Sequence, residues 1–165
     1  MNIKRIVKHL LATREQVRRA FPPSTLRMIE KTIKASETTH VGEIRFAVEC
    51  ALDGVPLFKE QSARERAIEV FSQLRVWDTQ HNNGLLIYVL LADRAVEIVA
   101  DRGIDAKVSS QEWNNICQQM ETAFTQSNYE GGVLSGVQAV TQHLVAHFPA
   151  DGHNGNELPD KPVVL

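Results

Sequence analysis

The run Leu85–Leu91 constrains the fold of this chain more than any other feature. Its residues, LLIYVLL, show no alternation of polar and apolar side chains. Successive side chains of a strand point to opposite faces of the sheet, so an uninterrupted apolar strand must be covered on both faces. The run is also much shorter than the roughly 20 residues that a membrane-spanning helix needs. It therefore predicts a central strand in a globular domain.

Two further segments are expected to join that strand in a sheet. Residues 43–50, EIRFAVEC, alternate in the way that is typical of a strand with one buried face, and Ala95–Ala100 returns after the tight turn at 92–94. A helix over 61–76 would connect the first two strands, and right-handed crossovers of this kind join parallel strands. The short turn makes the third strand antiparallel to the second.

Helical patterns flank these strands on both sides. The predicted helices cover 3–20, about 26–36, 61–76, about 110–125, and a last one that begins after Asn128. Helices before and after a small mixed sheet give an α/β protein with a three-layer α/β/α sandwich. We expect three parts: an N-terminal helical arm over residues 1–36, the α/β/α domain over 37–149, and a disordered tail over 150–165.

Charge is divided unevenly along the chain. Residues 1–35 carry nine basic and two acidic side chains, whereas the remainder carries nine basic and 18 acidic ones. The first helix is expected to be amphipathic with a basic outer face, its apolar positions being Ile3, Ile6, Val7, Leu10, Leu11 and Val17. That pattern suits packing on its own domain, and it equally suits an anionic membrane surface. A lack of aromatic residues disfavours nucleic acid.

The same basic residues interrupt any apolar centre of a secretory signal. The expected location is therefore the cytoplasm, with a membrane-peripheral position if the first helix binds lipid. Cys50 and Cys117 lack any paired spacing and are expected to be buried thiols rather than a disulfide. His143 and His147 lie four residues apart, but no third ligand accompanies them, so we expect ordinary histidines rather than a zinc site.

Two polar loops, 78–84 and 101–105, would lie at one end of the predicted sheet, beside His40, Gly42 and Glu43. Asp78, Asp101 and Asp105 offer carboxylate oxygens, and Asn82 or Asn83 offers an amide oxygen. This set of donors suits Ca²⁺ or Mg²⁺ better than zinc. The alternative is that Asp and Asn are there because they favour turns. Gly131, Gly132 and Gly136 match no phosphate-binding loop and are expected to allow close packing.

These loops carry a resemblance to a known family. Trp77-Asp78, the segment Asn82 to Leu86, and the segment Val99 to Asp105, followed by Phe124, Tyr129, Gly131-Gly132 and Gly136, resemble the TPM domain over roughly residues 38–149. The resemblance is to the short, cytoplasmic bacterial form. It implies an α/β/α sandwich, and it implies calcium binding or acid phosphatase activity, since members with these properties are described.

Two functions follow as hypotheses. The first is a module that binds a divalent cation or a partner protein and takes part in assembly or envelope-linked processes. The second is a slow metal-assisted acid phosphatase acting on phosphomonoesters. For the second, the expected substrate-binding residues are Asn83, Gly84, Arg102 and Gly103, and the catalytic residue is unknown because no side chain stands out as a nucleophile.

Overall fold

The computed structural model describes residues 2–152 and 155–165. Its centre is a mixed sheet in the order β3-β2-β1-β4. Strand β1 (Glu43–Glu49) pairs in parallel with β2 (Gly84–Leu90), and β2 pairs antiparallel with β3 (Ala95–Ala100) after the short 3₁₀ helix η1 (Leu91–Asp93). Every residue of β2 is buried. The predicted directions of these three strands and the central place of β2 are confirmed.

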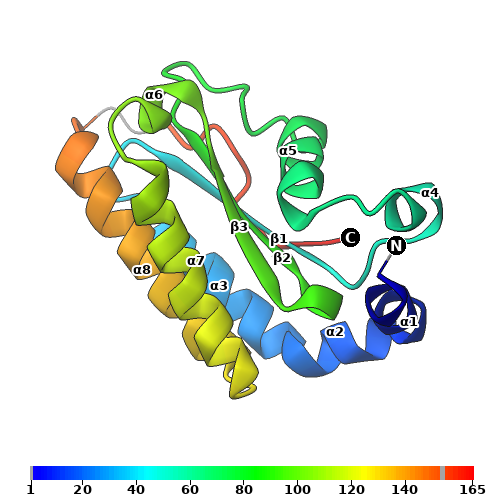
Figure 1. Ribbon diagram of the computed structural model, residues 1–165. Helices are drawn as coiled ribbons and strands as arrows, with labels where there is room; N and C mark the ends of the chain where they lie inside the picture. Colours follow the sequence, from blue (N-terminus) through cyan, green and yellow to red (C-terminus); the bar gives the residue numbers. More distant parts are fainter. Residues whose placement is uncertain (1, 153–154) are drawn as a thin grey trace.

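Helices cover both faces of the sheet (Figure 1). Helices α7 (Ser110–Thr125), α8 (Tyr129–His147) and α3 (Pro23–Ser36) pack on one side, and α5 (Ala63–Gln73) packs on the other. Alternate residues of β2 divide between the two layers: Leu85 and Ile87 join the core under α7 and α8, whereas Leu86 and Tyr88 join the core under α5. The predicted three-layer α/β fold is thereby confirmed.

Local signals place the helix starts correctly. The Ser62 hydroxyl accepts a hydrogen bond from the Glu65 amide, and the Glu65 carboxylate accepts one from the Ser62 amide, which makes a capping box at α5. Ser109 and Glu112 form the same motif at α7. Two short helices complete this part of the chain: α4 (Gly54–Phe58) and α6 (Arg102–Asp105). Among the described residues, no helix combines the length and the apolar character needed to cross a bilayer.

The N-terminal segment differs from the prediction of one helix over 3–20. It forms α1 (Ile3–Leu11) and α2 (Arg14–Ala20), separated by Ala12 and Thr13 in extended conformation. Thr13 caps α2 in a capping box with Gln16, which gives the second helix its own start. Phe21 then stacks near Phe46 of β1, with ring centroids 5.8 Å apart. The segment after α1 thus contributes to the main core.

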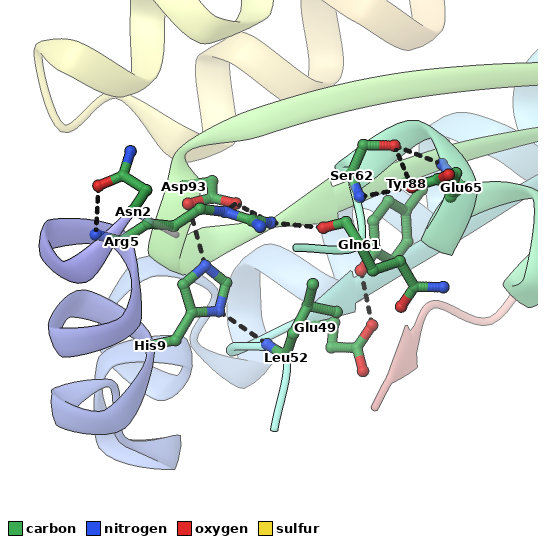
Figure 2. A network of polar contacts seen from close by, with 10 residues as sticks. All are labelled: Asn2, Arg5, His9, Glu49, Leu52, Gln61, Ser62, Glu65, Tyr88 and Asp93. Carbon is green, nitrogen blue, oxygen red and sulfur yellow. Dashed lines mark hydrogen bonds and ion pairs between the residues drawn. The ribbon is translucent and has the colours of Figure 1, made fainter. Parts of the chain in front are cut away.

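Helix α1 also has the opposite orientation to the one predicted. Its protein-facing side carries Arg5 and His9, the latter only 3% exposed, together with Ile6, which packs against the core. In contrast, Ile3, Leu10 and Leu11 are 64–70% exposed. The reason is a half-buried acceptor on the domain: Asp93 accepts hydrogen bonds from Arg5 and His9 (Figure 2). The basic outer face is present, since Lys4, Lys8 and the arginines of α2 are exposed and Val17 is buried. The expected packing of Ile3, Val7, Leu10 and Leu11 on the domain is wrong, because these side chains face outward.

Residues 155–165 lie along the sheet, although disorder was expected over 150–165; of that range, 153–154 lie outside the described residues. Strand β4 (Val163–Val164) pairs in parallel with Ala47 and Val48 of β1, and Leu158 is buried. Arg45 reaches across from β1 and donates to the Pro159 carbonyl. Strand β1 would otherwise expose a row of unpaired backbone groups, so the tail gains hydrogen bonds by covering that edge.

Candidate functional site

The two polar loops meet at one end of the sheet. Glu43 is level with Gly84 in the β1–β2 register, so the starts of both strands lie side by side. The Asp101 amide donates to the Gly84 carbonyl at 2.8 Å, and the Gly103 amide donates to the Asn82 carbonyl at 3.0 Å. The loop after β3 is therefore held directly against the loop before β2, as the topology predicted.

Two glycines allow this close approach. A Cβ atom added to Gly84 would lie 1.9 Å from the Val76 carbonyl oxygen, and one added to Gly103 would lie 2.5 Å from that of Asn82. Asn82 itself adopts a left-handed conformation with φ of 51°, which asparagine tolerates better than most residues. Backbone packing is thus sufficient to explain both glycines, which were predicted to bind substrate; contact with a substrate stays untested.

The two carboxylate oxygens of Asp101 lie in different environments. Oδ1 accepts a hydrogen bond from the Arg102 amide at 2.8 Å and caps α6. Oδ2 is buried, and no donor among the described residues reaches it. The side-chain Oδ1 of the neighbouring Asn83 is also buried without a donor, while its Nδ2 donates to the Val41 carbonyl. Two acceptor oxygens thus remain unsatisfied on the two joined loops.

The remaining predicted ligands are differently engaged. Asp78 is half exposed and forms an ion pair with Arg75 at 3.0 Å. Asn82 accepts a hydrogen bond from Arg102 Nε at 3.3 Å, and Asp105 is exposed on α6. Over residues 2–152 and 155–165, no group of three His, Cys, Asp or Glu side chains is arranged to hold a metal ion. A cation here would therefore need amide or main-chain oxygens beside Asp101.

An acidic cleft lies beside this loop junction, and sequence reasoning did not foresee it. It has a volume of about 610 Å³ and is formed by the end of α3, the start of β1, the loop before β2 and the C-terminal segment. Its charged and titratable lining residues are Lys34, Glu37, His40, Glu43, His81, Asp151, Glu157 and Asp160. The start of β1 was expected at this edge, but the contribution of residues 155–160 depends on the ordered tail.

Glu37 is the most perturbed carboxyl group in the cleft. Burial, together with the nearby charges of Glu43 and Asp160, raises its pKa to about 9, although the Ile44 amide donates to it at 2.8 Å. Burial likewise raises the pKa of Glu43, which accepts a hydrogen bond from the Leu158 amide at 3.1 Å. Burial lowers the pKa of His40 to about 4. At neutral pH the cleft therefore presents a protonated Glu37 and an uncharged imidazole.

Known structures share this fold. The NMR structure of the BA42 protein from the psychrophilic bacterium Bizionia argentinensis is similar with a TM-score of 0.74 and 28% sequence identity, covering 86% of this chain and 93% of that one. The solution NMR structure of the N-terminal domain of a protein from P. gingivalis has a TM-score of 0.61 at 22% identity, covering 76% of this chain and 79% of that one, and supports the fold alone.

Among curated protein sequences, none matches this chain. The profile described as the TPM domain matches residues 17–143. That range begins within α2, includes both loops of the junction and all of α3, α5 and α7, and ends within α8. Together with the shared fold, the match shows that the chain belongs to the TPM domain family.

Proposed function

We propose that this TPM-domain protein binds a divalent cation at the junction of loops 78–84 and 101–105. One observation carries the proposal: Asp101 Oδ2 is buried and accepts no hydrogen bond from the described residues. A buried carboxylate oxygen without a donor is costly, by roughly 1–3 kcal/mol or more for a charged group. A bound cation would remove that cost.

The chemistry of the neighbouring atoms fits a hard cation. Asp101 and Asn83 each supply an unsatisfied oxygen, and the main-chain carbonyls of Asn82 and Gly84 lie in the same loop junction. Oxygen donors of this mixed kind suit Ca²⁺, which accepts six to eight ligands in flexible geometry, and suit Mg²⁺ less well. Asp78 and Asp105 would add charge nearby. A cation that ties the two loops together would also fix the surface that they present to a partner protein.

Isothermal titration calorimetry with CaCl₂ and MgCl₂ tests this function. Asp101→Asn is the informative variant, because its amide oxygen can still cap α6 while the negative charge is removed. Asp160→Asn is a matched control in the neighbouring acidic cleft. We expect the wild-type protein and Asp160→Asn to bind Ca²⁺, and Asp101→Asn to bind at least about tenfold more weakly. Equal binding by all three proteins would contradict the proposed site.

Phosphomonoester hydrolysis is the second candidate, and Glu37 favours it. A phosphomonoesterase profits from a group that protonates the leaving oxygen, and a carboxyl with a pKa of about 9 still carries its proton at neutral pH. Arg102 is exposed beside Asn82 and could pair with a phosphate. The test is release of phosphate from an aryl phosphate. Glu37→Gln should lower the rate by about 10²-fold or more, and an unchanged or absent rate would count against this function.

A further inference from the structure

The exposed side of α1 is apolar, and this is unusual for a helix packed on its own domain. Ile3, Val7 and Leu10 follow the i, i+4, i+7 spacing that places side chains on one stripe, and they are 66%, 47% and 64% exposed. Lys4, Lys8 and Leu11 form the adjacent stripe, also exposed. The helix therefore presents an apolar stripe bordered by cations, while Arg5, Ile6 and His9 face the protein.

A polar network holds α1 in this orientation (Figure 2). Arg5 donates to Asp93 at 2.9 Å and to the Gln61 carbonyl at 2.8 Å. His9 Nε2 lies 3.0 Å from the other Asp93 oxygen, and its Nδ1 accepts from the Leu52 amide at 2.9 Å. Turning the apolar stripe inward would break all of these bonds. The outward apolar face is thus a fixed feature of the fold.

A basic cleft adjoins the same helix. Its volume is about 720 Å³, and Lys8, Arg19 and Arg94 line it together with Leu11, Tyr129 and Ser127. No acidic side chain is part of the described lining, although Arg19 also approaches Glu15 at 3.5 Å on the outer surface of α2. Cations above apolar walls suit a ligand with an anionic head and an apolar body.

The two clefts lie at opposite ends of β2. Gln80 and His81, before the start of this strand, line the acidic cleft, whereas Leu91 and Ala92, after its end, line the basic one. The molecule thus has an acidic end and a basic end. Helix α4, which contacts α1, adds the exposed side chains Val55 and Phe58 to the apolar surface in this region.

We propose that the exposed face of α1 and the adjacent basic cleft bind an anionic phospholipid surface, with Ile3, Val7, Leu10 and Leu11 entering the interface and Lys8, Arg19 and Arg94 contacting the phosphate headgroups. A convex apolar stripe bordered by lysines is the pattern of helices that lie in the membrane interface. The acidic end of the sheet would then face away from the lipid, because like charges repel.

Flotation of the full chain with phospholipid vesicles tests the proposal. One set of vesicles contains phosphatidylcholine alone, and the other contains phosphatidylserine as well. We expect binding to the anionic vesicles only, weakened by salt. Val7→Gln with Leu10→Gln should weaken that binding by about tenfold or more, because two exposed side chains no longer enter the interface. Circular dichroism would verify that each variant is folded.

Two further variants separate the parts of the surface. Lys4→Gln with Lys8→Gln should weaken binding about 25-fold, since each basic residue near an anionic membrane contributes about fivefold. Arg94 has a left-handed backbone with φ of 53°, which asparagine tolerates, so Arg94→Asn removes the charge without straining the backbone. This variant should weaken binding about fivefold.

Val145→Gln is the matched control, an exposed apolar residue of α8, and should bind like the wild-type protein. Failure to bind anionic vesicles would overturn the proposal, and a protein partner would then be the alternative ligand of the α1 face. Binding that the α1 variants and Val145→Gln alter equally would overturn it as well. Because these variants lie outside loops 78–84 and 101–105, none of these outcomes depends on cation binding.

Discussion

Replacing Glu37 with glutamine should change how stability depends on pH. The pKa of this carboxyl is about 9 in the folded protein, against an ordinary value of 4.5. Between these two values the folded chain retains a proton that the unfolded chain has released. The stability that Glu37 contributes is therefore complete below about pH 4.5 and decreases as the pH rises toward 9.

The expected size follows from that difference. Between the two pKa values, each unit of rising pH lowers the free energy of unfolding by about 1.4 kcal/mol. The wild-type protein would therefore lose at most about 4 kcal/mol of stability between about pH 5 and pH 8. Because Glu37 is only half-buried, water screens part of this effect, so we expect a loss of stability between about 2 and about 4 kcal/mol over this pH range. Glutamine resembles the protonated carboxyl and does not titrate, so Glu37→Gln should lack this loss.

Urea denaturation at about pH 5 and about pH 8 measures the effect as the free energy of unfolding. Glu43, Asp160, Arg45 and Lys34 are present in both proteins, so the difference between their pH dependences reports mainly on Glu37. Glu15→Gln, which alters an exposed carboxylate on α2, is the control and should follow the wild type. If Glu37→Gln lost as much stability as the wild type between the two pH values, a protonated Glu37 would be refuted.

Three other predictions concern packing and accessibility. Gly84→Ala should lower the free energy of unfolding by more than about 2 kcal/mol in thermal denaturation, since its Cβ would meet the Val76 carbonyl, whereas Gly155→Ala, in open space, should have little effect. Asp93→Ala should increase amide hydrogen exchange throughout α1 by removing the acceptor of Arg5 and His9, and unchanged protection would contradict the network. Iodoacetamide should modify half-buried Cys50 before Cys117, whose thiol pKa burial raises to about 12; simultaneous modification would argue against this packing.

The sheet could be predicted because its signals are local. An unbroken apolar run, an alternating strand and a short turn determine the order and direction of β1, β2 and β3, and capping boxes mark the starts of α5 and α7. The topology then placed loops 78–84 and 101–105 together. Whether that junction binds a cation depends on side-chain arrangement, such as the burial of Asp101 Oδ2 without a donor among the described residues, which sequence spacing does not reveal.

The errors arise from long-range contacts. Apolar spacing identifies α1 as amphipathic, but the face that it turns inward depends on Asp93, more than 80 residues away. The tail has the composition of a disordered segment, yet it covers the open edge of β1 and carries Asp160 to Glu37. The acidic cleft thus depends on segments that no local pattern relates to one another.

Backbone amide NMR during titration with Ca²⁺ and Mg²⁺ tests the proposed cation site most directly. We predict saturable shift changes in residues 79–84 and 101–105, which surround Asp101, and the same changes in Asp101→Asn only at cation concentrations at least about tenfold higher. Saturable changes confined to the acidic cleft near Glu37 and Asp160, or no changes up to millimolar cation, would contradict cation binding at the junction of the two loops.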